Sequence, residues 1–270
     1  MATADVTVMG AGVFGLSVAY ACAQRGAAVQ VLDPNGVGAG ASGGIVGALA
    51  PHVPELWNSK KAFQLDSLLM SADFWGGVSA ISGAETGYVR SGRLQPLADE
   101  QAVGLARDRI VTAQDLWQGR AEWTVIATSD APWEPPSASG FLVHDTLTGL
   151  IHPRQATQAL AKAVQALGGV IAGQGTPQGQ VVWATGWAGL LDMTEQNTRL
   201  VGNGVKGQAA LLAYDAAGLP QLFADGIHIV PHLDGTVAIG STSERYFDDP
   251  ALTDNGLDDV IARARAAMPV

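Results

Sequence analysis

A glycine-rich turn near the N-terminus, set between an apolar strand and an apolar helix, constrains the fold of this chain most strongly. Residues 6–8 predict a short buried strand, residues 10–15 read Gly-Ala-Gly-Val-Phe-Gly, and residues 16–23 repeat apolar side chains at helical spacing. Residues 28–32 then predict a second strand, which stops at Asp33. This order predicts the βαβ unit of an α/β fold with parallel strands.

The glycines of this turn and the acidic residue after it indicate a ligand. Gly10 permits the tight strand-to-helix turn, Gly12 lets a pyrophosphate approach the backbone, and Gly15 lets the helix pack close to the strand. The unpaired N–H groups at the helix N-terminus attract phosphates. Asp33 can accept hydrogen bonds from ribose hydroxyls, and its charge disfavours a 2′-phosphate. The unit therefore predicts binding of an adenine dinucleotide other than NADP.

The turn alone does not distinguish FAD from NAD, but the segment after it helps to identify the cofactor. Residues 36–52 are small and apolar, without strong periodicity at their start. Such a segment can run extended beside a large flat ring, or it can be a flexible linker. In a solvated linker, the apolar side chains of Ile45, Val46 and Leu49 would be exposed to water. We therefore interpret the segment as a buried lining of the cofactor.

At this point the sequence resembles a known family. The turn with Asp33, followed by residues 40–51 (Gly-Ala-Ser-Gly-Gly-Ile-Val-Gly-Ala-Leu-Ala-Pro), is similar to the D-amino acid oxidase and glycine oxidase family of FAD-dependent oxidoreductases. Later segments agree in order, namely residues 150–154 (Leu-Ile-His-Pro-Arg), 181–187 (Val-Val-Trp-Ala-Thr-Gly-Trp), 205–208, 229–231 and 237–242. The resemblance implies FAD as cofactor. It also implies oxidation of the C–N bond of a small amine or amino acid by hydride transfer to flavin.

The resemblance and the local patterns predict two discontinuous domains. The fold class is α/β, with a Rossmann-like FAD-binding domain and a second, mainly antiparallel β substrate domain. The FAD-binding domain is expected over 1–80 and 141–200, and the substrate domain over 81–140 and 201–270. Helices are predicted at 59–78, 101–117 and 153–167, and a last one after a cap at Thr253 or Asp254.

The resemblance also names the residues expected at the cofactor. They are Gly10, Gly12, Val13, Phe14, Gly15, Asp33, Ala41, Ser42, Gly43, Ile45, Val46, Gly47, Ala184 and Gly186. No acid–base dyad is required, because the flavin carries the chemistry. The catalytic residues therefore stay unassigned.

His228, His232 and Arg245 are the candidates for substrate contact. Family members often place a tyrosine at the position of His228 and an arginine at that of His232. The spacing of the two histidines suggests a metal pair, but residues i and i+4 of a strand lie about 13 Å apart. We therefore expect no metal site, and the simpler interpretation is solvent-facing or hydrogen-bonded histidines.

The resemblance implies elements that this sequence does not show. The family continues with a strand whose arginine clamps the substrate carboxylate, and with a glycine-rich turn and helix against the flavin. A natural truncation or a shortened gene is therefore expected, with a homo-oligomer or a partner chain covering the exposed sheet. One alternative function is a non-catalytic FAD- or adenine-nucleotide-binding subunit or truncated remnant. Another is an NAD-dependent dehydrogenase, although no catalytic His or Lys constellation follows the nucleotide-binding unit.

Composition excludes several other classes. A net charge of −10 and the absence of any Lys/Arg run argue against nucleic acid as a partner. No apolar stretch approaches the ~20 residues of a membrane span, and no basic segment precedes the first strand, so a cytoplasmic protein is expected. Cys22 is the single cysteine, which excludes an internal disulfide and a cysteine-based metal cluster.

Overall fold

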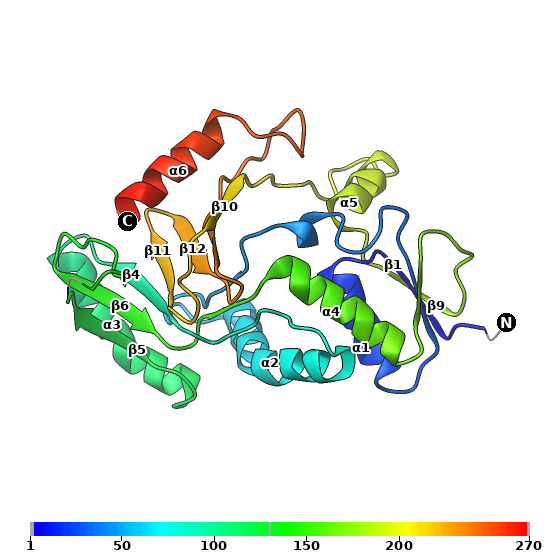
Figure 1. Cartoon of the computed structure of the whole chain (residues 1–270), viewed down its shortest axis with the longest axis horizontal. Helices are drawn as coiled ribbons and strands as arrows, with labels where there is room; N and C mark the ends of the chain where they lie inside the picture. Colours follow the sequence, from blue (N-terminus) through cyan, green and yellow to red (C-terminus); the bar gives the residue numbers. More distant parts are fainter. Residues whose placement is uncertain (1–2, 130, 269–270) are drawn as a thin grey trace.

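The computed structural model, which describes residues 3–129 and 131–268, is built on two β-sheets (Figure 1). A four-stranded sheet has the order β8-β2-β1-β9, and a seven-stranded sheet has the order β10-β13-β12-β11-β4-β6-β5. A two-stranded pair is formed by β3 (Ala48–Leu49) and β7 (Gly149–Leu150). These strands stand where the chain passes from the four-stranded sheet to the seven-stranded one and back. The predicted fold class, a parallel unit with a second mainly antiparallel unit, is confirmed.

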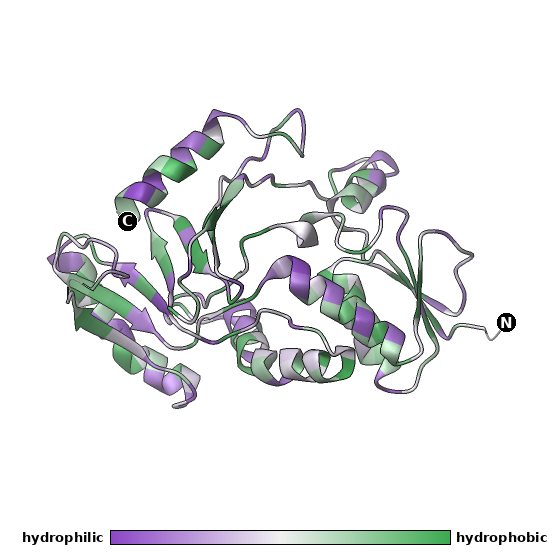
Figure 2. Cartoon of the chain, in the orientation of Figure 1, coloured by the Kyte–Doolittle hydropathy of each residue, from purple (hydrophilic) through white to green (hydrophobic). Residues whose placement is uncertain are grey.

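The four-stranded sheet is entirely parallel, as the predicted βαβ unit requires. Its strands are β1 (Val6–Met9), β2 (Val29–Leu32), β8 (Val170–Ala172) and β9 (Gln180–Trp183). In Figure 2, the parallel strands overlap edge-on and are mostly green, that is, hydrophobic. One face packs on α1 (Val13–Ala23) and α4 (Pro153–Ala166), through Val6, Val8, Val29, Val31, Ile171 and Val182. This face forms the core of the first domain.

The seven-stranded sheet is antiparallel except where β11 pairs with β4 in parallel. Its strands are β4 (Arg93–Pro96), β5 (Trp123–Ala127), β6 (Phe141–Asp145), β10 (Ala209–Ala213), β11 (Gln221–Ala224), β12 (Ile227–Pro231) and β13 (Thr236–Gly240). α3 (Glu100–Trp117) packs at β5, and α6 (Asn255–Ala267) covers β10, β12 and β13. The contacts of α6 and of α3 with the sheet each form a buried apolar cluster.

The helix boundaries follow from the capping residues in the sequence. Asn58 accepts the amide of Lys61 at the start of α2 (Ser59–Ser82), and Asp254 accepts the amide of Gly256 at the start of α6. Asp99 accepts the amide of Ala102 at the start of α3. These side chains satisfy amides that the first helical turn leaves unpaired. All four helices predicted after the glycine turn are confirmed; α5 (Gly186–Glu195) is an addition to them.

One predicted domain boundary needs a correction. Residues 141–200 were expected in the FAD-binding domain, but β6 pairs with β4 and β5 in the seven-stranded sheet. The antiparallel pairing of β6 with β4 and β5 decides this placement. We propose that the chain returns to the first domain after β7, where α4 begins.

A buried ion pair connects two strands of the larger sheet. Arg93 Nε on β4 lies 2.9 Å from Asp145 Oδ2 on β6, and both side chains are almost completely buried. Asp145 Oδ1 also accepts the amide of Thr148. Because both carboxylate oxygens have partners, the pair is compatible with burial.

In the described residues, no helix is both long and apolar enough to cross a bilayer.

Candidate functional site

The glycine turn is held by backbone contacts that admit no side chain. Gly10 has φ of 114°, and a Cβ there would lie 2.3 Å from the carbonyl oxygen of Ala184. A Cβ on Gly15 would lie 2.0 Å from the oxygen of Gly10. Both distances are far below any normal contact, so only glycine fits at these two positions. The turn therefore brings the start of α1 directly against the ends of β1 and β9.

The N-terminus of α1 presents main-chain amides at this turn. Ser42 Oγ accepts the amide of Val13 at 2.9 Å, and a Cβ on Gly12 would lie 3.0 Å from the same oxygen. The amides of Gly12 and Phe14 pair with no acceptor among the described residues. Unpaired amides and the helix dipole together form an anion site. Phe14 itself is 82% exposed.

Asp33 lies at the end of β2, beside the same turn. Its Oδ2 accepts the amide of Ala11 at 2.7 Å, and its Oδ1 accepts the amide of Asn35 at 2.9 Å. Each carboxylate oxygen can accept a further hydrogen bond. The carboxylate is therefore fixed in place and still able to accept from ribose hydroxyls.

The segment expected to line the cofactor packs between the two sheets. Ile45 and Val46 contact Val230 and Ala238 of the seven-stranded sheet. A Cβ on Gly47 would lie 1.8 Å from the oxygen of Ile151, so this residue must be glycine. These contacts contradict a flexible linker.

The remaining predicted cofactor residues surround the turn. Ala41 and Gly43 bound a short 3-10 turn, and Arg154 Nε donates to the oxygen of Gly43 at 2.8 Å. Ala184 donates its amide to Met9 and abuts Gly10, while Gly186 starts α5 next to it with φ of 64°. The structure thus brings the predicted residues to one end of the parallel sheet. Their contacts with FAD stay a prediction.

The three substrate-contact candidates are not brought together. His228 lies on β12, with Nδ1 2.6 Å from Gln221 Nε2 and its ring 4.6 Å from that of Phe223. His232 is completely buried, with Nε2 2.9 Å from the oxygen of Ile45, which removes it from the surface that a substrate could reach. Arg245 is exposed beyond β13.

Sequence reasoning missed the polar neighbours of His228. Gln221 pairs in register with Arg93, and the guanidinium carbon of Arg93 lies 5.8 Å from the centre of the Phe223 ring. Burial, together with the charge of Arg93, lowers the pKa of His228 to about 4. His228 is therefore neutral at pH 7. The β11–β12 hairpin brings Gln221 to His228, whereas the pairing of β11 with β4 adds Arg93. Among the residues that the structure covers, no group of three potential metal ligands is found.

Comparison with known proteins now decides the family. A family model described as FAD dependent oxidoreductase matches residues 5–270. The chain belongs to this family. Its cofactor is therefore FAD rather than NAD, and the resemblance seen in the sequence is confirmed.

Individual relatives agree with this assignment. The bifunctional protein ThiO/ThiG of Trichormus variabilis is 27% identical over 303 residues, covering 99% of this chain and 44% of that protein. The tRNA-modifying bifunctional protein MnmC of Albidiferax ferrireducens is 33% identical over 127 residues, covering 46% of this chain and 18% of that protein. The chain thus spans less than half the length of these curated relatives.

Solved structures share the fold at low sequence identity. Glycine oxidase from Geobacillus kaustophilus has a TM-score of 0.80 at 19% identity, with 98% of this chain and 78% of that chain covered. Iminodiacetate oxidase from Chelativorans sp. BNC1 gives 0.78 at 17%, with 98% and 79% covered. L-proline dehydrogenase from P. horikoshii gives 0.75 at 18%, with 99% and 77% covered.

Replacing Asp33 tests the geometry of the nucleotide site. We expect Asp33→Ala to weaken binding of both FAD and ADP by about tenfold or more, because a charged acceptor for the ribose is lost. Isothermal titration with each ligand measures this. Asp5→Ala is the matched control, since Asp5 accepts the amide of Ala28 at the opposite end of the same sheet. Equal ADP affinity in all three proteins would refute the assignment.

The lowered pKa of His228 predicts a pH-dependent stability. The unfolded histidine titrates near 6.5, and the folded one at about 4. The stabilisation is therefore complete above pH 6.5 and is lost as the pH falls toward 4. The loss is at most about 3 kcal/mol, reduced by solvent screening. Urea unfolding between pH 7.5 and 4 measures it, and His228→Gln should flatten the profile. A variant with the unchanged wild-type slope contradicts this prediction.

Proposed function

We propose that this chain oxidises the C–N bond of a small amine or amino acid with FAD. The observation that carries the proposal is the convergence of Ser42, Asp33 and the α1 amides at one end of the parallel sheet. From this end, the segment containing Ile45 and Val46 leads directly to the seven-stranded sheet. A dinucleotide held at the N-terminus of α1 would thus reach the polar face of the seven-stranded sheet.

The proposed reaction is a two-electron oxidation of the amine. The carbon that bears the amine gives up a hydride and the nitrogen gives up a proton, which leaves an imine. Water then hydrolyses the imine to a carbonyl compound and ammonia or an amine. FAD, when bound, supplies the two-electron acceptor. The amides of Gly12 and Phe14 would hold the diphosphate, Asp33 the ribose, and residues 45–48 the ring.

The substrate class rests on the names of structural relatives and on one polar cluster. The solved proteins of similar fold are named for glycine, iminodiacetate and L-proline. In this chain, His228 lies opposite Gly240, where a Cβ would be 2.9 Å from Val46. This position beside the cofactor-lining segment supports His228 as a substrate contact. Its neutral ring would contribute a hydrogen bond rather than a charge.

Flavin binding and turnover test the proposal separately. The purified chain, reconstituted with FAD, is expected to show a flavin absorption band. It should also release hydrogen peroxide, or reduce a dye, with at least one member of a panel of glycine, sarcosine, D-amino acids and proline. Bound flavin without either signal would favour the non-catalytic FAD-binding subunit. A colourless protein that does not bind FAD would overturn the cofactor site itself.

We further propose that a second copy of the chain covers β9. This strand is an edge of the parallel sheet, and Trp183 and Val181 are 71% and 39% exposed on the face that α1 and α4 do not cover. Neighbouring α5 has no buried residue. Parallel sheets are normally covered on both faces, and twofold-symmetric dimers are the commonest closed oligomers.

Sedimentation velocity of the purified chain tests this surface. We expect a dimer at micromolar concentration and a shift to monomer for Trp183→Lys, because a charged side chain in the middle of the interface opposes burial. Phe63→Lys, which changes an exposed aromatic residue on α2, is the matched control and should stay dimeric. A wild-type monomer contradicts the proposal and points to a different partner.

A further inference from the structure

His232 makes a polar contact that links the end of β12 to the segment before β3. The residue follows β12 and is completely buried. Its Nε2 lies 2.9 Å from the carbonyl oxygen of Ile45, at a sequence separation of 187 residues. Ile45 belongs to the segment that is proposed to line the flavin.

The direction of this hydrogen bond fixes the state of the imidazole ring. A carbonyl oxygen only accepts, so His232 Nε2 carries the hydrogen. In the neutral ring, Nδ1 is then an acceptor, and it has no partner in the described part of the chain. Burial, the largest influence, lowers the pKa of His232 and favours this neutral form. The titratable groups that influence it are His152 and Asp234.

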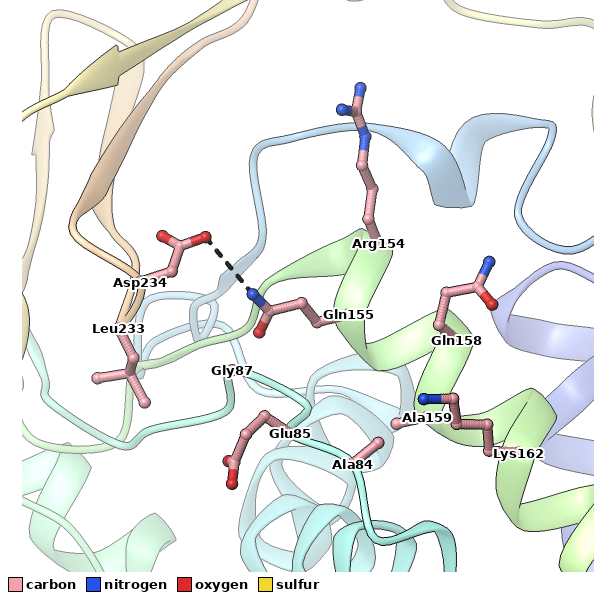
Figure 3. A pocket seen from close by; sticks show the side chains of 10 residues that line it. All are labelled: Ala84, Glu85, Gly87, Arg154, Gln155, Gln158, Ala159, Lys162, Leu233 and Asp234. Carbon is pink, nitrogen blue, oxygen red and sulfur yellow. Dashed lines mark hydrogen bonds between the residues drawn. The ribbon is translucent and has the colours of Figure 1, made fainter.

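The turn that carries His232 is itself held against the start of α4. Gln155 Nε2 donates to Asp234 Oδ2 at 3.4 Å, as Figure 3 shows beside a cavity of about 640 Å³. His152 caps α4 and lies 3.5 Å from the same carboxylate, with its ring 4.6 Å from that of His232. Asp234 Oδ1 accepts from both the amide and the hydroxyl of Thr236. His232 is thus fixed from α4 as well as from β12.

We propose that His232 is a positioning residue for the cofactor, since it fastens the main chain at Ile45 to the substrate sheet. The proposal rests on the proposed flavin site. Packing alone does not explain the residue, because an apolar side chain would fill the space without an unpaired buried nitrogen. Among residues 3–129 and 131–268, the oxygen of Ile45 is the single hydrogen-bond partner of the ring. A donor at this position is therefore what the structure requires.

Two variants separate the hydrogen bond from the volume of the ring. His232→Leu keeps apolar bulk and removes the donor, whereas His232→Gln keeps an N–H at similar reach. We expect the Leu variant to raise the dissociation constant for FAD about tenfold, the effect of one net hydrogen bond. We also expect faster amide exchange in residues 44–49 and 150–152 of the apo protein, where Ile151 donates to Gly47. The Gln variant should restore both values.

Ile229→Val is the matched control. Ile229 lies on the same strand but packs on the opposite face, in the core beneath α6. It should lower the unfolding temperature without changing FAD affinity or exchange at 44–49. Should the Leu variant not fold, His232→Asn replaces it, because its shorter amide does not reach Ile45.

The outcomes distinguish this inference from the function on which it rests. Wild-type affinity and wild-type exchange in His232→Leu would overturn the positioning role while leaving the flavin site intact. Weakened affinity in both Leu and Gln variants would also overturn it, since the donor would not matter. If the wild-type chain binds no FAD, the proposed function fails, and the exchange measurement alone still decides whether His232 holds the segment.

Discussion

The contact between the N-terminus of α1 and the ends of β1 and β9 is the constraint on which the site depends. Gly15 touches the oxygen of Gly10, and Gly10 touches the oxygen of Ala184, at distances that exclude any side chain. The same approach places the amide of Ala11 on Asp33 and that of Val13 on Ser42. Helix dipole, ribose acceptor and backbone amides therefore share one small volume. A single added methyl group at Gly10 or Gly15 would separate them.

From this volume, the chain runs along a fixed path to the substrate sheet. Gly47 lies against the oxygen of Ile151, and β3 pairs with β7 immediately afterwards. Ile45 and Val46 then pack on β12 and β13. Since each step is a backbone contact or a buried apolar contact, the distance between the nucleotide site and the substrate sheet is set by packing. This explains how a segment so rich in glycine can be ordered.

The local features of the structure could be predicted from sequence, because their causes are local. The glycine turn, Asp33 and the helix cap at Asp254 each act within a few residues. The order of the larger sheet could not, since the pairing of Gln221 with Arg93 joins residues more than a hundred positions apart.

The histidines show the same limit at the level of the site. The strand period places His228 and His232 on one face, four residues apart, although β12 ends at Pro231, one residue before His232. It does not show that the segment at Ile45 closes over His232, or that β11 supplies Gln221 to His228. Burial of a strand residue depends on what packs above it, and Ile45, which closes over His232, lies 187 positions away in the chain.

The two faces of the sheet then differ in kind. Leu222, Ile229 and Ile239 form the apolar face in the core that α6 covers, whereas Arg93, Gln221 and His228 lie on the face that meets Val46. Stability alone would favour apolar residues on both faces, because buried polar groups are expensive to desolvate. Gln221 even keeps an unpaired buried oxygen. Under the proposed function, this polar face would be the one that contacts the amine or amino acid.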